Sequence, residues 1–433
     1  MKVKDIIDQF IAGDWGEETC SNETPCAVTC VRGADIIPIS EYNFSAIPIR
    51  YITQQSYLKN RLQVGDIIIE KSGGSPTQST GRVSFVSQEL LDSVGSVVCS
   101  NFCTAFRVKK GWNPLYVYYY FQFIYNLGLF FNFEGKTSGL KNLQLDAAFA
   151  AIPIDDVSES TQNKIVAVLQ GLEKKIALNR QINQNLEAMA KQLYDYWFVQ
   201  FDFPNEEGKP YKSSGGKMIW NEKLKREIPN GWNNCTLQEF LTIKNGRDHK
   251  HLATGSHPVY GSGGEMRRVN EYLFSGESVL MPRKGTLNNI MYVNESFWTV
   301  DTMFYSEMKI VHSAKYVFFA IKDIDFTKWN SGTGLPSMTA STLYNISMIK
   351  PSDDLLKRFN DVLIPVFYKI KQTKDECEKL IRQRDELLPL LMNGQVSVNS
   401  DLSVCINLII RTTTRICSYS NDLFWSYLRI VFL

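Results

Sequence analysis

Two short segments combine basic side chains with glycines, a pairing that lets charged groups and backbone N–H groups reach phosphate oxygens together. The first is Lys71-Ser72-Gly73-Gly74, which follows the strand-like run DIIIE and precedes Arg82. The second is Arg283-Lys284-Gly285-Thr286, which adds a hydroxyl group. A plain surface turn would have the same residues. We nevertheless expect both segments to contact the backbone of a nucleic acid.

The second segment lies in a stretch with a local surplus of positive charge. Its seven basic residues are Lys244, Arg247, Lys250, Arg267, Arg268, Arg283 and Lys284. Only four acids accompany them, which leaves a surplus of three. We therefore predict DNA contacts at Lys244, Arg247, Arg283 and Lys284. Tyr260, Ser262 and Gly263 could lay their backbone against a base edge, although a β-turn packed on its own domain remains open.

Motifs for catalysis are incomplete. Gly135-Lys136-Thr137-Ser138 ends like a phosphate-binding P-loop, but Phe130 stands where the opening glycine is required. Asn113-Pro114-Leu115-Tyr116 resembles the N-P-P-Y of amino-methyltransferases, yet Leu115 replaces a proline and no glycine-rich cofactor strand precedes it. We expect no catalytic residue and no cofactor in this chain. An enzyme with chemistry that these motifs do not reveal remains an alternative.

Composition limits the remaining classes. The formal net charge is only +2, so DNA contacts must come from local patches. Nine cysteines include no C-x-x-C pair, and the four histidines lie far from Cys20, Cys26 and Cys30, so we expect reduced thiols and no metal site. The start lacks the apolar core of a signal peptide, which predicts a cytoplasmic location. The apolar stretch from Leu115 to Phe133 is interrupted by polar residues and predicts a buried aromatic helix instead of a membrane span.

The chain repeats itself at a period near ~195 residues, far longer than that of a solenoid. The segment TSGLKNL, which begins at Thr137, corresponds to GTGLPSM, which begins at Gly332, with Gly139 opposite Gly334. Each segment leads through a short strand-like run into a long helix. The sequence therefore predicts two copies of one unit, each a mainly β domain followed by a helix.

Both predicted helices have apolar residues every seven positions, as in a coiled-coil seam. The seam of the first helix is Ile165, Leu172, Asn179, Leu186 and Leu193, and that of the second is Phe359, Val366, Thr373, Leu380 and Leu387. Asn179 and Thr373 each put a polar residue in mid-stripe, a device that can fix register and partner. We expect the two helices to pack antiparallel, although two unrelated core helices remain open.

Several segments in combination resemble the specificity subunit of type I restriction-modification enzymes. These are LEAMAKQLYDYWFVQFDFP at the end of the first helix, REIPNGW before the second domain, GDIIIEKSGGSPTQSTGRVSF, and VYGSGGEMRRVNEYLFSGESVLMPRKGTLNNIMYVNESFWTVDTMFYS. The similarity covers residues from about 20 to 395. It implies an α+β fold in which two mainly-β target-recognition domains are separated by two long antiparallel coiled-coil helices, in a pseudo-two-fold tandem repeat.

The resemblance also implies an organisation and a set of partners. We expect target-recognition domains at 1–157 and 232–351, spacer helices at 158–201 and 352–395, an extended linker at 202–231, and an atypical tail at 396–433. Each domain would read one half of a split double-stranded DNA site. Two methyltransferase subunits would dock on the helices and restriction/translocase subunits would join for cleavage, so S-adenosylmethionine and ATP with Mg would bind to the partners. A tandem protein-binding scaffold is the rival interpretation.

Overall fold

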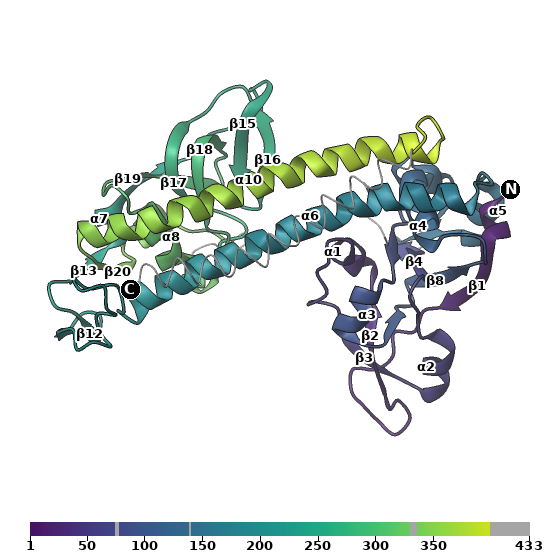
Figure 1. Cartoon of the computed structure of the whole chain (residues 1–433), viewed down its shortest axis with the longest axis horizontal. Helices are drawn as coiled ribbons and strands as arrows, with labels where there is room; N and C mark the ends of the chain where they lie inside the picture. Colours follow the sequence, from purple (N-terminus) through teal and green to yellow (C-terminus); the bar gives the residue numbers. More distant parts are fainter. Residues whose placement is uncertain (74–77, 138–139, 330–335, 399–433) are drawn as a thin grey trace. The chain divides into compact units, whose positions relative to one another are not determined.

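The computed structural model describes residues 1–73, 78–137, 140–329 and 336–398, so Gly74 and most of the expected tail lie outside the described residues. The chain divides into two compact units. Unit 1 combines Met1–Gln181 with 374–398, and unit 2 is Ile182–Thr373. Two long helices, α6 (Glu159–Tyr194) and α10 (Asp353–Met392), contribute to both units (Figure 1). Each unit holds the first part of one helix and the last part of the other, so the two helices run antiparallel within it.

Unit 1 is built on a four-stranded antiparallel sheet. Its strands in order are β1 (Ile7–Ala12), β8 (Cys103–Val108), β4 (Ile67–Glu70) and β6 (Val83–Phe85). Two three-stranded sheets adjoin it, one of β3 (Ile49–Ile52), β2 (Cys26–Val31) and β7 (Val97–Cys99), the other of β5 (Ser72–Gly73), β10 (Leu140–Leu143) and β9 (Glu134–Thr137). The short helices are η1 (Val3–Ile6), η2 (Gly33–Asp35), α1 (Ile36–Ser40), α2 (Gln54–Asn60), α3 (Gln88–Val94), α4 (Pro114–Asn126), η3 (Leu129–Phe133) and α5 (Leu145–Ala151).

The aromatic run forms the buried helix α4, as expected from the sequence. Asn113 caps its first turn by accepting a hydrogen bond from Leu115 N at 2.9 Å, and Pro114 occupies the first helical position. Tyr116 to Phe121 are all buried, so this helix supplies much of the unit 1 core. Among the described residues, no helix combines the length and the apolar character that crossing a membrane requires.

Unit 2 is built on a six-stranded sheet. Its strands in order are β14 (Leu241–Asn245), β19 (Met303–Met308), β17 (Phe274–Pro282), β18 (Met291–Thr299), β15 (Thr254–Gly261) and β16 (Gly264–Val269). Two strand pairs accompany it, β13 (Asn233–Thr236) with β20 (Ser347–Lys350) and β11 (Met218–Asn221) with β12 (Arg226–Pro229). The shorter helical elements are η4 (Asp195–Val199), α7 (Leu237–Phe240), α8 (Ala314–Lys322), η5 (Phe326–Trp329) and α9 (Ala340–Tyr344).

The two units repeat one topology. The order β1-β8-β4-β6 in unit 1 corresponds to β14-β19-β17-β18 in unit 2. In unit 1 Leu143 N donates to Lys71 O at 2.7 Å, and in unit 2 Met338 N donates to Arg283 O at 2.9 Å. Leu143 and Met338 are the last residues of the two segments aligned in the sequence, so the hydrogen bonds confirm that alignment and the tandem repeat.

The segment 202–231 is not the extended linker that the sequence predicted. It contains regular secondary structure and a packed aromatic cluster. Within 202–231, β11 and β12 pair as an antiparallel hairpin. Phe203 stacks on Tyr211 with ring centroids 4.7 Å apart, and on Trp232 at 5.1 Å. The segment is rich in glycine and charge, but its aromatic residues provide enough apolar surface to fold it against the domain.

All ten predicted seam residues are buried or half-buried. The polar ones find polar partners on the other helix. In unit 1 Asn179 Nδ2 donates to Glu376 Oε2 at 2.8 Å, and in unit 2 Thr373 Oγ1 donates to Asn183 Oδ1. The antiparallel packing of the helices is therefore observed in each unit, while a supercoiled knobs-into-holes geometry stays a prediction.

Each domain is attached to a long helix by a polar contact of a different kind. In unit 2 the buried Lys315 of α8 donates to Glu277 Oε1 at 2.5 Å and to Asn360 Oδ1 on α10 at 2.7 Å. In unit 1 Tyr119 of α4 donates to Glu173 Oε2 on α6 at 2.6 Å. In unit 2 the contact with the helix is thus a lysine that donates to an amide while it pairs with an acid of its own domain, and in unit 1 it is a phenol that donates to a carboxyl group.

Candidate nucleic-acid interface

Four loops of unit 2 meet at one end of its sheet, and together they form what we call cradle 2. They are Gly246-Arg247 after β14, Ser262-Gly263 between β15 and β16, the loop 283–286 after β17, and the turn 300–303 between β18 and β19. Arg283 N and Lys284 N donate to Thr302 O at 2.8 and 3.2 Å. A Cβ atom on Gly285 would lie 2.8 Å from Ser262 Oγ, so two of the predicted contact loops touch each other.

Unit 1 assembles the corresponding loops into cradle 1. They are Gly13-Asp14 after β1, Arg32-Gly33 after β2, Lys71–Gly73 after β4, and the turn 100–103 between β7 and β8. Lys71 N and Ser72 N donate to Phe102 O at 2.9 and 3.0 Å, as Arg283 N and Lys284 N do to Thr302 O in cradle 2. Lys71 therefore corresponds to Arg283, and Phe102 to Thr302.

Both cradles depend on a glycine that no other residue could replace without movement. A Cβ atom on Gly13 would lie 2.0 Å from Ser100 O, and one on Gly246 would lie 2.0 Å from Val300 O. These distances are far below van der Waals contact, so the end of β1 or β14 can press against the neighbouring turn only because the side chain is absent. Each cradle is thus a rigid frame of backbone.

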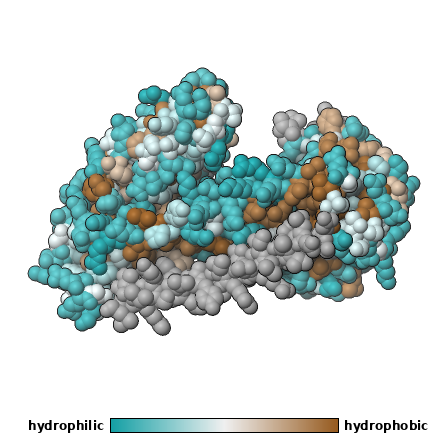
Figure 2. Space-filling view, turned by 45° about the horizontal axis from the view of Figure 1, so that its top comes forward, coloured by the Kyte–Doolittle hydropathy of each residue, from teal (hydrophilic) through white to brown (hydrophobic). Residues whose placement is uncertain are grey.

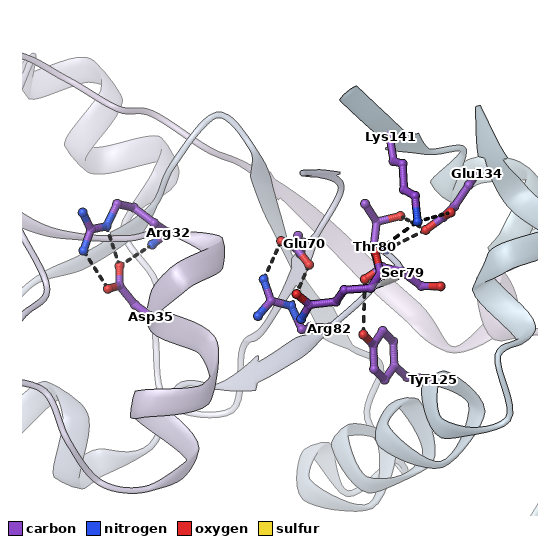
Figure 3. Close-up of polar contacts among 10 residues, drawn as sticks. Arg32, Asp35, Glu70, Ser79, Thr80, Arg82, Tyr125, Glu134 and Lys141 are labelled. Atoms are coloured by element: carbon purple, nitrogen blue, oxygen red, sulfur yellow. Dashed lines mark hydrogen bonds and ion pairs between the residues drawn. The ribbon is translucent and has the colours of Figure 1, made fainter. Parts of the chain in front are cut away.

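The cations around cradle 1 are mostly neutralised by acids (Figure 3). Arg82, a predicted DNA contact, donates from Nε and Nη2 to the two oxygens of Glu70 at 2.9 and 2.7 Å. Only 3% of the Glu70 side chain is exposed. Arg32 pairs with Asp35 at 2.9 Å, and Lys141 with Glu134 at 3.4 Å. The guanidinium of Arg82 is therefore engaged inside the domain, and its contact with DNA stays a prediction.

Lys71 is the exception in cradle 1. It is half-buried, and no hydrogen bond or ion pair joins its side chain to another residue in the described part of the chain. Ser72 Oγ donates to Asn142 Oδ1 at 2.6 Å, and Gly73 has the left-handed φ of 135° that glycine adopts readily. The loop therefore presents one unpaired ammonium group on a fixed backbone.

Cradle 2 has more unpaired positive charge. Arg247 and Lys284 are exposed, and neither has an ion-pair partner among the residues that the structure describes. The Arg283 guanidinium carbon lies 5.8 Å from the centroid of the Phe304 ring. Lys244, by contrast, pairs with Glu307 at 3.6 Å on an exposed surface, where such a pair contributes little. Gly263 and Thr286 are exposed at loop tips, so their predicted contacts are sterically open.

Tyr260 is a second correction. Only 5% of this residue is exposed, and its strand β15 pairs with β16 on one side and with β18 on the other. Its hydroxyl donates to Glu295 Oε1 at 2.9 Å, and burial together with the Glu295 charge raises the pKa of the phenol. The side chain belongs to the core, where its ring lies 6.2 Å from that of Phe297. Its backbone is committed to the sheet and does not face a groove.

Sequence reasoning missed Glu70 and Phe102. Glu70 sits at the end of the apolar run DIIIE and is buried against Gly33 and Gly73. Phe102 lies in the segment SNFCTAF, and 54% of it is exposed. The adjacent Ser100-Asn101 pair was the available signal, because these residue types mark a turn whose tip faces solvent.

Large apolar side chains are exposed on unit 1. The exposed large apolar residues of unit 1 include Ile49, Leu58, Phe102, Leu127 and Phe131. On the face drawn in Figure 2 the larger brown area lies over unit 1, among otherwise hydrophilic residues. Unit 2 also exposes large apolar side chains, among them Trp220, Met266 and Tyr272, so the units differ in where such side chains lie and not in whether they have them.

Comparison with known proteins identifies relatives over most of the chain. The type I restriction modification DNA specificity domain matches twice, at residues 36–188 and 229–378. The chain is 25% identical over 270 residues to the type I restriction enzyme MjaIX specificity subunit of Methanocaldococcus jannaschii, a match that covers 56% of this chain and 60% of that protein. It is 21% identical over 339 residues to the HindI specificity subunit of Haemophilus influenzae, covering 61% of this chain and 73% of that protein.

A solved structure shows the same fold. The S subunit of a type I restriction-modification system from M. genitalium superposes with a TM-score of 0.53 at 15% identity, over 90% of this chain and 95% of that one. The two domain matches cover well over half of the residues and coincide with the two repeated units. The chain therefore belongs to the type I restriction-modification DNA specificity domain family.

Proposed function

We propose that this chain is the DNA-specificity subunit of a type I restriction-modification complex, in which unit 1 and unit 2 each read one half of a bipartite site. The observation that carries the proposal is the repetition of one four-loop cradle with a basic residue, Lys71 or Arg283, at the same place in each copy. Backbone and cations of this kind fix a protein on the phosphates, and side chains around them read the bases.

The partners follow from this role. Two methyltransferase subunits dock on α6 and α10, and restriction/translocase subunits join them in the cytoplasm. S-adenosylmethionine, ATP and Mg bind to these partners, and this chain supplies recognition alone. The hydrogen bonds from Tyr119 to Glu173 on α6 and from Lys315 to Asn360 on α10 support the arrangement, since they hold each domain to an element on which a methyltransferase would dock.

The decisive experiment is to co-express the chain with its genomic neighbours in a host without other methyltransferases, and to sequence the modified bases. We expect methylation at one motif made of two short sequences separated by unread positions. A cradle 2 variant, Arg247→Ala with Lys284→Ala, should reduce methylation at all copies of the motif. An assembled complex that methylates no DNA, or methylates it without sequence preference, would contradict the proposal.

The rival role, a scaffold that binds only proteins, makes a different prediction. The purified complex would then bind duplex DNA no better than its partner subunits alone do. Binding of random duplex DNA that weakens with added salt, and that depends on this chain, would exclude the scaffold.

A further inference from the structure

Phe102 occupies an unusual place for a large apolar residue. It lies at the tip of the turn 100–103, with 54% of its surface exposed. The turn is closed by a hydrogen bond from Cys103 N to Ser100 O at 2.9 Å. Beneath it Cys99 and Cys103 are buried, and burial raises the pKa of Cys103 to about 12, so that thiol is neutral and forms part of an apolar floor. The ring is therefore held on a rigid base and projects away from the core.

The fold itself does not require an aromatic residue here. In unit 2 the same turn is closed by Met303 N donating to Val300 O at 2.9 Å, and the position of Phe102 is taken by Thr302. A threonine thus supports the same backbone and accepts the same two hydrogen bonds through its carbonyl oxygen. Exposing the Phe102 ring to water brings no stability, because an apolar side chain gains only when it is buried. The exposed ring is available to a partner outside the chain.

The surroundings of Phe102 indicate what that partner is. Its carbonyl oxygen accepts hydrogen bonds from Lys71 N and Ser72 N, so Phe102 and Lys71 lie on adjoining loops of cradle 1, and no residue in the described part of the chain pairs with the Lys71 side chain. A surface that joins an unpaired cation to an exposed aromatic ring fits DNA, whose phosphates attract the lysine and whose bases offer apolar groups. A phenyl ring cannot donate or accept a conventional hydrogen bond. In the major groove the base feature that its apolar surface can contact is the 5-methyl group of thymine.

We propose that Phe102 reads a thymine in the half-site of unit 1 by packing against its 5-methyl group. The inference rests on the proposed function, since it assigns a specificity residue to that same reading surface. It also accounts for the difference between the copies, because Thr302 offers a much smaller apolar surface at the equivalent position. Phe102 is thus one source of the difference between the two half-sites.

The test uses the complex of this chain with its methyltransferase subunits and duplexes that carry the methylated motif. Each thymine of the motif is replaced in turn by uracil, which keeps the hydrogen-bonding groups and lacks only the methyl group. For the parent complex, one replacement should weaken binding about fourfold, the effect of one buried methyl group. For Phe102→Thr, the residue that unit 2 carries in this turn, the same replacement should change affinity by less than about twofold.

A matched control separates this effect from a general loss of apolar surface. Phe131, on η3, is 60% exposed, and Phe131→Ala should retain the full uracil penalty. Three results would each overturn the inference. Phe102→Thr could keep the full uracil penalty, or it could fail to assemble with the methyltransferases. The half-site of unit 1 could also contain no thymine on either strand. A parent complex that assembles but binds no DNA sequence specifically would instead refute the proposed function.

Discussion

The two units place the same backbone cradle at the end of the same sheet, but they treat charge in opposite ways. Around cradle 1 the cations Arg32, Arg82 and Lys141 are each neutralised by a carboxylate. Around cradle 2 Arg247 and Lys284 are exposed and unpaired within the described residues. A frame that tolerates both arrangements shows that the backbone holds the loops in place while the side chains decide what they bind. Two copies can thus diverge in specificity without a change of fold.

The acids that lie near the long helices also differ between the units in how readily they carry a charge. In unit 2 burial alone would raise the pKa of Glu277, but hydrogen bonds from Lys315 and Tyr292 outweigh burial and lower it. In unit 1 burial dominates and raises the pKa of Glu173, which a hydrogen bond from Tyr119 only partly offsets. Unit 2 therefore hides a charged pair, and unit 1 hides a carboxyl group that is more easily kept protonated.

The largest effect is expected from Lys315→Met, which removes the cation of the buried pair and leaves Glu277 without its partner. Loss of one member of a buried pair costs about 3 kcal/mol. Hydrogen exchange measured by mass spectrometry should show this loss in β17 and β18 of unit 2 and little change in β4 and β8 of unit 1. Lys328→Met, at a side chain that is 76% exposed, is the control. Equal loss of protection in both units would contradict the assignment of this pair to unit 2 alone.

The next effect concerns DNA binding by cradle 2. Arg247→Ala with Lys284→Ala should reduce the slope of log affinity against log salt concentration by about 1.8, since each phosphate contact contributes about 0.9. Titrations of a labelled duplex at several salt concentrations measure it. Lys141→Ala in unit 1 should leave the slope unchanged, because that lysine is 13% exposed and pairs with Glu134. Equal salt slopes for the parent, the double variant and Lys141→Ala would show that Arg247 and Lys284 do not contact DNA phosphates.

A smaller effect is expected when one acid is removed from cradle 1, because cradle 1 then gains unpaired positive charge, as cradle 2 has. Glu70→Gln keeps an oxygen that can accept from Arg82 but removes the negative charge that neutralises it. The salt slope should then rise by up to about 0.9, as Arg82 gains one charge for the phosphates. The same duplex titration measures the change, and thermal unfolding checks that the variant is folded. A folded variant with the same salt slope as the parent would show that Arg82 does not contact DNA phosphates.

The smallest effect is a pH dependence in unit 1. Because the folded pKa of Glu173 is raised above its unfolded value, ionisation of this residue destabilises the fold once the pH rises through the interval between the two. Glu173→Gln should therefore raise the unfolding temperature at pH 8 and leave it unchanged below about pH 4, where the unfolded carboxyl is also protonated. The exposed Glu23→Gln serves as the control. A gain that is equal at both pH values would show that ionisation of Glu173 is not responsible.

Periodicity and internal repetition predicted most of the fold. The heptad spacing located α6 and α10, and the alignment of Gly139 with Gly334 predicted equivalent residues that the hydrogen bonds of Leu143 and Met338 confirm. The segment 202–231 was missed because its glycine and charge content concealed the aromatic residues that fold it. Local composition indicates where a chain turns, whereas packing depends on which side chains meet later.

The candidate site was predicted less completely. The glycine and lysine pattern located the loops at Lys71 and Arg283, because backbone approach depends on local residue types. The sequence did not reveal that Arg82 and Tyr260 have partners inside the domain, because these partners, Glu70 and Glu295, lie 12 and 35 positions away in the sequence. Phe102 was missed for the related reason that exposure of an aromatic residue depends on the turn beneath it. The tertiary packing of the chain decides which charged side chains stay unpaired and which aromatic rings stay exposed.

The division of α6 and α10 between the units has a consequence for biosynthesis. Within the described residues unit 2 is the stretch Ile182–Thr373, which contains its whole large core cluster, so this core can form as soon as the stretch has left the ribosome. Unit 1 cannot, because the core cluster that contains Ile165 and Leu169 also contains Leu388 and Leu391. At about 5 to 20 residues per second, the early part waits roughly 10 to 40 s with this apolar stripe uncovered. The half of the protein that is translated first is the half that finishes folding last.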